Sequence, residues 1–338
     1  MASAACSVII VGYRSRPLLE RCLPSVLAED AARDIIVVDN HSDDGTLEWL
    51  TETHPQVKVL ANPVNAGYGA ACNQGWEAAR EEYGLILNPD TVLVPGALEQ
   101  LLATAASHPD ALINPVLLQP DETVNAYGNR MHLTGIASCE GLGETWSDNP
   151  PLRYPLLASG AAILTRRAVW NRLGGFDPDY FLYFEDTDLS LRAQLLGIPV
   201  ICDTRARIIH AYALNLTPMK FFLLERNRLM TLLTVYQRTT LRKLLLPLLL
   251  MEMATWAYAL TKGPAYLFAI VRGYGWLWAH RSALREKRRR IQAARVASDQ
   301  VILTRTTPGL PFDQLIPSGL ARLLSRATAP LFHGGRAL

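Results

Sequence analysis

An apolar run that ends in a short polar turn sets the plan of this chain: Leu85-Ile86-Leu87-Asn88-Pro89-Asp90-Thr91. The run is typical of a buried parallel strand, and pairing should stop at Pro89 because proline has no N–H to donate to a ladder. Asp90 would then stand at the carboxyl end of a strand, the edge where open α/β sheets bind ligands. A carboxylate there suits a hard divalent cation that holds phosphate oxygens, whereas an Asx-type turn would need no ligand. These residues alone leave both interpretations open.

Size and composition limit the possible classes of protein. The chain has 338 residues with 49% hydrophobic content, enough for one large domain or for a domain with an appendage. A formal net charge of +2 gives no general argument for a nucleic-acid partner, so we expect none. The five cysteines show no metal-type pairing, and residues 1–6 lack the basic region of a secretory leader. Together these features predict reduced thiols and a cytoplasmic location.

The first half alternates apolar strands, polar turns and helices, which predicts parallel βαβ units with right-handed crossovers. We expect strands, in order, over residues 7–11, 34–38, 57–60, 85–87, 154–164 and 198–202. Between about residues 114 and 155 the periodicity fades, and we expect loops and short strands there.

Two further strand ends are unusually polar. The second strand ends in the run from Asp39 to Thr46, and a helix cap needs only one such residue, so the surplus suggests a ligand. The third strand leads to Asn62–Gly69, whose glycines would let the backbone approach a phosphate or sugar. A plain turn is the simpler explanation of that glycine-bearing loop when it is taken alone.

A second chemical centre lies in the run from Gly174 to Arg192. It places four carboxylates among aromatic rings just before an expected helix, those of Asp179, Glu185, Asp186 and Asp188. Helix capping explains acidic residues in a first turn but not the aromatic neighbours. A carboxylate against an aromatic ring is partly desolvated, which raises its pKa and makes it a better general base. We therefore predict catalytic use of Glu185 or Asp186.

A histidine follows the last predicted strand. His210 comes after the apolar-rich run Ala206–Ile209, and a histidine in such a position is usually structural. If the chain folds back so that this segment flanks Asp90, His210 could instead ligate a metal or contact a phosphate.

Seven short motifs lie between about residues 7 and 212: Val37-Val38-Asp39-Asn40 with Ser42 and Asp44-Gly45, Asn65-Ala66-Gly67-Tyr68-Gly69, Asn73-Gln74-Gly75, Leu87-Asn88-Pro89-Asp90-Thr91, Ser159-Gly160-Ala161, Gly174-Gly175-Phe176-Asp177 and Tyr183-Phe184-Glu185-Asp186-Thr187-Asp188-Leu189. Together, and in this order, they resemble the inverting family 2 glycosyltransferases of GT-A fold, particularly the rhamnosyltransferase-like branch that builds bacterial surface glycans. The resemblance implies an α/β fold with a Rossmann-like, mixed, mainly parallel sheet flanked by helices, followed by C-terminal apolar and amphipathic helices.

The resemblance also implies a nucleotide-sugar donor, with dTDP-rhamnose the first choice and UDP-sugars or GDP-mannose next. Asp39 would bind the nucleobase or ribose, and the Gly12-Tyr13 turn would pack on the base. Asp90 would ligate Mg²⁺ or Mn²⁺ on the diphosphate, with His210 as the family's late histidine. Asn88 departs from the commonest Asp-x-Asp pattern, and the loss of one negative charge would weaken the affinity for the metal. The residues expected to bind the donor are Gly12, Tyr13, Asp39, Asn40, Asn65, Gly67, Asn73, Asn88 and Asp90.

The implied reaction is an inverting transfer of rhamnose or another hexose to a hydroxyl of a lipid-linked or surface-glycan acceptor. By resemblance Asp186 is the general base, and Glu185 is the reserve choice. Two alternatives are a sugar-1-phosphate nucleotidyltransferase and a non-catalytic membrane-bound scaffold that binds nucleotide sugars. The first would need a glycine-rich, basic phosphate loop that is missing near Gly12, and the second would need neither Asp90 nor the carboxylate pair.

The C-terminal part changes character. We expect the transferase domain over residues 1–220, a helical membrane-associating region over 221–297 and a tail over 298–338. Apolar pieces after Leu244 are each broken before about 20 residues, and Trp and Tyr lie near charges. This pattern favours an interfacial helix pair on the bilayer, with a helical core, a homodimer surface or a spanning hairpin as alternatives.

A basic cluster follows these helices and contains Arg281, Arg285, Lys287, Arg288, Arg289 and Arg290. Such a cluster beside an apolar anchor predicts attraction to anionic lipids, although a solvated helix face is the alternative. We therefore expect a peripheral enzyme on the inner, cytoplasmic face of the plasma membrane.

Overall fold

The computed structural model describes residues 5–211, 216–307, 309 and 310. The chain divides into two compact units, which are described separately. Unit 1 comprises Met1–Asn129, Cys139–Ala193 and Ile198–Ala213, and unit 2 comprises Arg130–Ser138, Gln194–Gly197 and Leu214–Leu338. The functional boundaries expected at residues 220 and 297 stay predictions.

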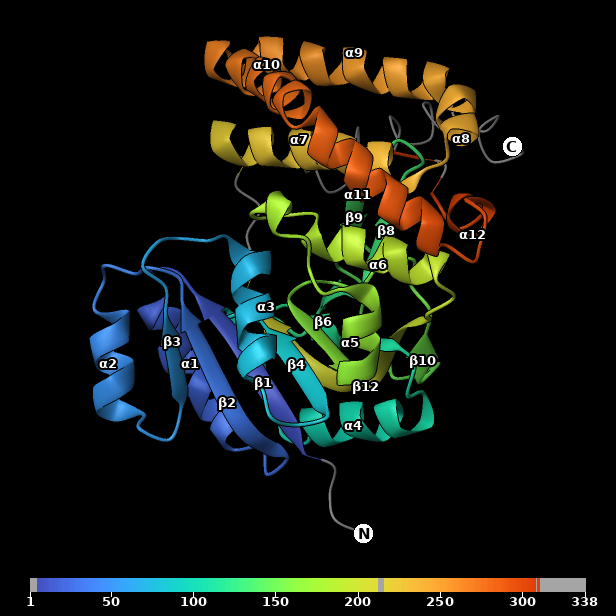
Figure 1. Cartoon of the computed structure of the whole chain (residues 1–338). Helices are drawn as coiled ribbons and strands as arrows, with labels where there is room; N and C mark the ends of the chain where they lie inside the picture. Colours follow the sequence, from blue (N-terminus) through green and yellow to red (C-terminus); the bar gives the residue numbers. More distant parts are fainter. Residues whose placement is uncertain (1–4, 212–215, 308, 311–338) are drawn as a thin grey trace. The chain divides into compact units, whose positions relative to one another are not determined.

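Unit 1 is built on a sheet with the strand order β10-β12-β6-β11-β4-β1-β2-β3, in which β5 also pairs with β12 and β7 with β6 (Figure 1). Its strands are β1 (Cys6–Gly12), β2 (Ala32–Asp39), β3 (Lys58–Ala61), β4 (Tyr83–Leu87), β5 (Thr91–Leu93), β6 (Leu112–Leu118), β7 (Val124–Ala126), β10 (Leu152–Arg153), β11 (Ala162–Arg166) and β12 (Val200–His210). The strands β3, β2, β1 and β4 are parallel, and β11 runs antiparallel to β4. The predicted mixed, mainly parallel sheet is therefore confirmed.

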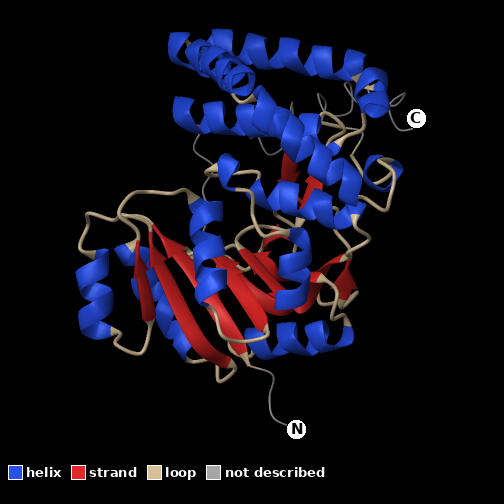
Figure 2. Ribbon diagram, viewed as in Figure 1, coloured by secondary structure: helices blue, strands red, loops and turns tan. Residues whose placement is uncertain are grey.

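Helices flank this sheet (Figure 2). They are α1 (Arg16–Leu27), α2 (Thr46–Thr53), α3 (Tyr68–Ala78), α4 (Ala97–Ser107), α5 (Arg167–Leu173) and α6 (Glu185–Leu195), the last of which runs on into unit 2. Side chains of β1 alternate between two layers, as the pleat requires. Val8 belongs to one core cluster with Leu23 of α1 and Leu101 of α4. Ile9 faces α3 instead, where a Cβ on Gly75 would overlap its side chain, so glycine lets α3 pack directly on β1.

The structure corrects the strand assignment in the middle of the chain. Loops and short strands were expected from residue 114, but Leu112–Leu118 forms the buried seven-residue strand β6. Pro115 makes this strand hard to predict from the sequence, since proline is rare inside sheets. It lies opposite Asp203, where the register of β12 shifts, and this irregularity accommodates the missing N–H. The last strand is also longer than predicted, because it continues through the shift to His210.

The strand predicted over residues 154–164 is wrong except for its last three residues, because β11 begins only at Ala162. The short strands β7 and β10 lie within residues 114–155, as the fading periodicity predicts.

Unit 2 is mainly helical. It contains α7 (Pro218–Val235), α8 (Arg238–Lys243), α9 (Leu245–Lys262), α10 (Pro264–Ala279), α11 (Arg281–Ala294) and α12 (Gln300–Leu303), and the small sheet of β8 (Asn129–Met131) and β9 (Ala137–Cys139) joins it. The buried guanidinium of Arg228 on α7 lies 2.7 Å from Glu225 and 2.5 Å from Glu252 of α9. Because a buried charge needs partners, this network fixes α9 against α7. Among the helices of the described residues, none is both long enough and apolar enough to cross a membrane.

Candidate functional site

The predicted donor-binding segments meet at one edge of the sheet in unit 1. Strand β1 pairs with β2 on one side and with β4 on the other, so the carboxyl ends of β1 and β4 border the crevice where strand order reverses. Gly12 lies opposite Asp39 in the register, and the Asn88–Asp90 turn follows Leu87, which lies opposite Ile10. The topology therefore brings three polar strand ends together, as the sequence predicts.

Asp39 has one carboxylate oxygen that lacks a partner. Its side chain is buried, and Oδ2 accepts the N–H of Ser42 at 3.2 Å. Oδ1 is buried and has no hydrogen-bond partner within the described residues. Because an unsatisfied buried oxygen is costly, Asp39 suits a hydroxyl or N–H donor of a bound ligand. Tyr13 is exposed, and the guanidinium of Arg14 lies 5.3 Å from its ring centroid.

Asn40 organises the loop that follows β3. Its Nδ2 donates to Asn65 Oδ1 at 2.9 Å and to Gly67 O at 3.3 Å. Its Oδ1 accepts the N–H of Ala66 at 2.9 Å and Nδ2 of Asn62 at 3.1 Å. These bonds use both donors and both acceptor positions of the amide. Direct contact of Asn40 or Asn65 with a donor stays a prediction.

Gly67 and Asn73 join this loop and α3 to the segment before the carboxylate pair. Gly67 adopts a φ of +85°, and a Cβ there would lie 2.8 Å from Phe181 Cα. The N–H of Tyr68 donates to Phe181 O at 2.6 Å. Asn73 accepts the N–H of Phe176 at 3.0 Å and donates to its carbonyl at 2.8 Å. The two chemical centres of the sequence are therefore physically connected.

The segment before the carboxylate pair is strained. Phe181, Tyr183 and Phe184 have φ values of 63°, 67° and 71°. Left-handed backbone costs a residue with a Cβ roughly 1–2 kcal/mol. Such strain persists only where the surroundings enforce it, and it is common at functional sites.

Asp90 and His210 come together because β12 folds back along β5, with His210 opposite Thr91. His210 Nε2 lies 3.4 Å from Asp90 Oδ1, and His210 Nδ1 lies 3.1 Å from Asn125 Oδ1. Apart from His210, the described chain offers that Asp90 oxygen no hydrogen-bond donor. The segment of His210 therefore flanks Asp90, the arrangement in which His210 could ligate a metal or contact a phosphate.

These two side chains fit a divalent cation that is completed by substrate. Within the described ranges, no group of three or more His, Cys, Asp and Glu could hold a metal. Mg²⁺ commonly uses one or two protein ligands together with substrate phosphates, so Asp90 and His210 would suffice only with a diphosphate present. Asn88 is half-buried at the start of this turn, where its N–H donates to Ala161 O at 2.8 Å.

Glu185 and Asp186 lie in the first turn of α6 in different environments. Asp186 is half-buried, Oδ2 accepts the N–H of Gly160 at 2.8 Å, and Oδ1 accepts the N–H of Thr187 at 2.6 Å. Glu185 is buried, and its Oε2 has no hydrogen-bond partner in the described part of the chain. Burial, and then the charge of Asp186, raise the pKa of Glu185 to about 8. Burial also raises the pKa of Asp186, but the N–H groups of Gly160 and Thr187 oppose that rise.

The different surroundings of Glu185 and Asp186 give the two carboxyl groups different protonation states. Since N–H donors stabilise a carboxylate, Asp186 is the member that ionises first while Glu185 keeps its proton. Asp186 is also the less buried residue of the pair. Both observations support Asp186 as the general base, and the assignment stays a prediction.

Sequence reasoning missed the residues that position these groups. The hydroxyl of Tyr68 donates to Gly160 O at 3.0 Å, so it holds the residue whose N–H meets Asp186. A Cβ on Gly160 would lie 3.1 Å from that carboxylate. Gly160 and Tyr68 each lie in one of the seven motifs, so the sequence marked both residues. It did not indicate which groups they would contact. Nothing in the sequence indicated that Asn125 would meet His210.

We expect Glu185→Gln to stabilise the fold, with a gain that grows with pH. A carboxyl group whose pKa rises on folding disfavours the folded state once the unfolded chain ionises. That penalty begins above the ordinary value of 4.5 and is complete above about 8, whereas glutamine stays neutral throughout. Each kcal/mol gained should raise Tm by roughly 2–4 °C. Tm of both proteins across this pH range checks the prediction, with the exposed change Glu48→Gln as control, and a pH-independent difference would contradict it.

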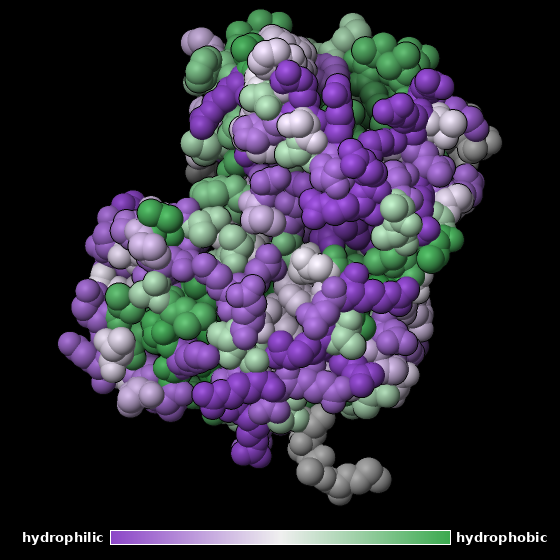
Figure 3. Space-filling view, viewed as in Figure 1, coloured by the Kyte–Doolittle hydropathy of each residue, from purple (hydrophilic) through white to green (hydrophobic). Residues whose placement is uncertain are grey.

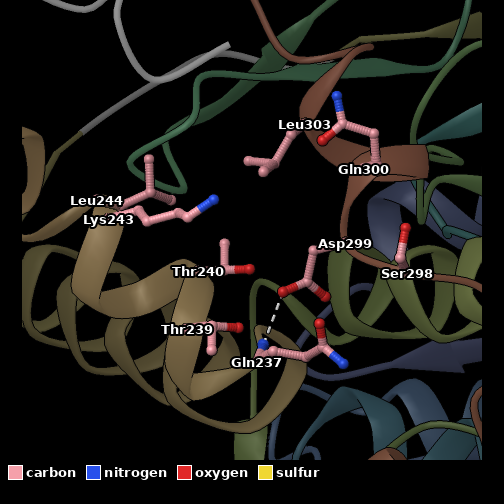
Figure 4. Close-up of a pocket in the computed structure, with 9 residues that line it drawn as sticks. All are labelled: Gln237, Thr239, Thr240, Lys243, Leu244, Ser298, Asp299, Gln300 and Leu303. Atoms are coloured by element: carbon pink, nitrogen blue, oxygen red, sulfur yellow. Dashed lines mark hydrogen bonds between the residues drawn. The ribbon is translucent and has the colours of Figure 1, made fainter. Parts of the chain in front are cut away.

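One pocket of unit 2 contains none of the predicted site residues (Figure 4). It is lined by Gln237, Thr239, Thr240, Lys243, Leu244, Ser298, Asp299, Gln300 and Leu303. Asp299 already accepts the N–H of Gln237 at 2.7 Å and an N–H of Arg295 at 2.5 Å. We assign this pocket no part in the chemistry.

The mixed, mainly parallel sheet flanked by helices matches solved GT-A glycosyltransferases, which confirms the predicted fold class. The chain belongs to glycosyl transferase family 2, whose family model matches residues 7–172. It is thus an enzyme of the hexosyltransferase class, and this finding sets aside the nucleotidyltransferase and the non-catalytic scaffold.

Two curated relatives carry related names. The N-acetylglucosaminyl-diphospho-decaprenol L-rhamnosyltransferase of Mycobacterium tuberculosis is 31% identical over 229 residues, which cover 60% of this chain and 75% of that protein. The rhamnosyltransferase WbbL of Escherichia coli is 25% identical over 207 residues, which cover 56% of this chain and 77% of that protein.

Two solved structures share the fold. The structure of GalNAc-T7 with UDP, GalNAc and Mn²⁺ has a TM-score of 0.59 at 15% identity, covering 70% of this chain and 49% of that one. The mannosyltransferase PcManGT of Pyrobaculum calidifontis, in complex with GDP-Man and Mn²⁺, has a TM-score of 0.52 at 17% identity, covering 98% and 86%.

Proposed function

We propose that this enzyme transfers L-rhamnose, or another hexose, from a nucleotide-diphosphate donor to a hydroxyl of a lipid-linked sugar, with inversion at the anomeric carbon. The rhamnosyltransferase names of the two relatives support the choice of sugar, and the decaprenol in one name supports the acceptor. The single observation that carries the proposal is the half-buried Asp186, whose carboxylate the N–H of Gly160 orients.

The residues of the chain account for a single displacement. The buried Asp39 and the Gly12-Tyr13 turn would hold the nucleoside at the carboxyl edge of the sheet. Asp186 would accept the proton of the acceptor hydroxyl while its oxygen forms a bond to the anomeric carbon. The bond from that carbon to the diphosphate breaks on the opposite face, so the configuration inverts.

We propose that Asp90 and His210 hold Mg²⁺ or Mn²⁺ at the diphosphate. A bound divalent cation would stabilise the negative charge that develops on the leaving group. The distance of 3.4 Å between Asp90 Oδ1 and His210 Nε2 supports this proposal, and so does the Mn²⁺ named with both solved structures.

Release of nucleoside diphosphate tests the proposed function. We would incubate the enzyme with dTDP-rhamnose, UDP-sugars or GDP-mannose and a polyprenyl-diphosphate-linked N-acetylglucosamine, with Mg²⁺, with Mn²⁺ or with a chelator. We expect acceptor-dependent release from dTDP-rhamnose and a product of inverted anomeric configuration. Acceptor-dependent release from another donor alone would reject rhamnose, and a product of retained configuration would reject the single displacement.

A further inference from the structure

Two helices of unit 2 expose apolar side chains along one side, which we call the outer stripe. It consists of Leu245, Leu246, Leu249, Met253 and Leu260 on α9 and Phe268, Val271 and Trp278 on α10, each between 53% and 70% exposed. Apart from the adjacent Leu245 and Leu246, they follow one another at intervals of three, four or seven residues, so they fall on one side of each helix. Single exposed apolar residues are ordinary, whereas a contiguous set marks a surface that binds something.

The other sides of α9 and α10 pack inside unit 2. The ring of Tyr258 on α9 lies 5.7 Å from that of Phe221 on α7, centroid to centroid. On α10, Gly273 faces Arg226 of α7, where a Cβ would lie 3.8 Å from the arginine Cβ. Since α7 receives the inner sides of both helices, which lie side by side (Figure 1), the outer stripe faces away from α7.

Charge is kept out of the part of the outer stripe that lies on α9, and the one charged residue of α10, Arg272, lies 4.4 Å from the ring centroid of Phe222 on α7. The only charged residues of α9 are Glu252 and Lys262, and Lys262 ends the helix. Glu252 turns inward, where it accepts from Arg228 at 2.5 Å and from the Tyr274 hydroxyl at 2.5 Å. A helix side that faced only water would be interrupted by solvated charges.

Helix α11 adds exposed positive charge directly after the stripe. Its exposed cations are Arg281, Arg285, Arg289 and Arg290. The single acidic residue of α11, Glu286, pairs with Arg289 at 2.9 Å. The guanidinium of Arg281 lies 4.6 Å from the ring centroid of Trp278, so the basic set adjoins the stripe. Figure 3 shows hydrophilic side chains gathered over α11 and hydrophobic ones along the edge formed by α9 and α10.

We propose that the outer stripe and the exposed arginines of α11 form a docking surface for a bilayer that contains anionic lipids. Apolar side chains enter the boundary of the acyl chains, Trp278 lies at headgroup level, and the arginines meet anionic headgroups. A second copy of the chain fits less well, because a two-fold contact would bring two like-charged arginine sets to one interface. The proposal does not depend on which sugar is transferred.

Vesicle sedimentation with the full-length chain tests the surface. We would compare phosphatidylcholine vesicles with and without phosphatidylglycerol, at about 0.05 M and about 0.5 M salt. We expect binding to the vesicles that contain phosphatidylglycerol, and weaker binding at the higher salt. Equal binding to both kinds of vesicle, or no binding to either, would overturn the proposal.

Variants separate the apolar and the charged contributions. Met253→Glu with Phe268→Glu should weaken binding roughly tenfold or more, because two charges would have to enter the apolar boundary. Arg285→Gln with Arg289→Gln should weaken binding to anionic vesicles roughly fivefold for each arginine. Val296→Glu is the matched control, since Val296 is 72% exposed outside the stripe.

The same variants distinguish a membrane-binding surface from a contact between two copies of the chain. The substituted side chains are exposed, so each variant should keep the wild-type Tm and its release of nucleoside diphosphate. Wild-type binding by the stripe variant would overturn the proposal. So would light scattering that shows a dimer dissociated by the stripe variant, together with no vesicle binding by the wild type, because the stripe would then be a contact between two copies.

Discussion

Asp186→Asn should lower kcat by roughly 10²–10⁴-fold, the usual contribution of a general base, while the enzyme still binds its nucleotide sugar. The amide cannot accept the proton of the attacking hydroxyl. We propose that donor binding depends on Asp39 and the Asp90 turn, which the substitution leaves intact. Thermal-shift titration with the nucleotide sugar measures binding, and initial rates of diphosphate release measure turnover.

The geometry around Asp186 calls for a stability control. Its two oxygens accept the N–H groups of Gly160 and Thr187, and asparagine has one oxygen where the carboxylate has two. The amide nitrogen would face an N–H, which costs about 1–3 kcal/mol. Some loss of Tm is therefore expected, and rates must be compared at a temperature where both proteins are folded.

Two matched variants identify the base within this segment. Glu185→Gln removes the neighbouring carboxyl group and should reduce kcat far less than Asp186→Asn. Asp179→Asn changes an earlier carboxylate of the segment and should leave the rate near that of the wild type. If Glu185→Gln proved the more damaging of the pair, the roles assigned from burial and hydrogen bonding would be reversed.

Asp90→Asn should lower kcat/KM by roughly 10²–10³-fold, comparable to the loss of one group that stabilises charge in a transition state. The change keeps the shape of the side chain but removes its negative charge, and with it most of the attraction for a divalent cation. The Tm increase caused by nucleotide sugar should then become independent of added Mg²⁺ or Mn²⁺. This second measurement needs no turnover.

A double-mutant cycle with His210→Gln decides between the two interpretations of that histidine. If Asp90 and His210 hold one cation, the second substitution costs little once the first is present, so their effects are not additive. If His210 only supports the fold, the two effects on kcat/KM should add. Asp30→Asn, an exposed change in the turn between α1 and β2, is the control and should be neutral.

The strand ends of the first half could be predicted because each signal was local. An apolar run followed by Asp39 or by the Asn88–Asp90 turn specifies a strand and its polar end within a few residues. Strand β6 was hidden because Pro115 is unfavourable in a sheet, and only the irregular register opposite Asp203 makes it acceptable. That compensation lies far along the chain, where no local pattern can show it.

The same distinction applies to the candidate site. Asp39, Asp90 and the pair Glu185–Asp186 could be named from their residue types and places in the motifs. Their environments could not, because the N–H that orients Asp186 belongs to Gly160, and β12 must fold back before His210 meets Asp90. Burial raises the pKa of Glu185, and N–H donors oppose the rise in the pKa of Asp186. Both effects depend on long-range packing.

The sheet order also bears on how the chain folds as it leaves the ribosome. Strand β11 pairs between β4 and β6, so one edge of β4 waits unpaired until residues 162–166 have been made. His210 is the last residue of β12, so it meets Asp90 only when that strand docks on β5. A nascent chain therefore has the strand ends of the proposed nucleoside site early and the proposed site for the leaving group late. Synthesis that stops before His210 would leave the proposed donor site without this histidine.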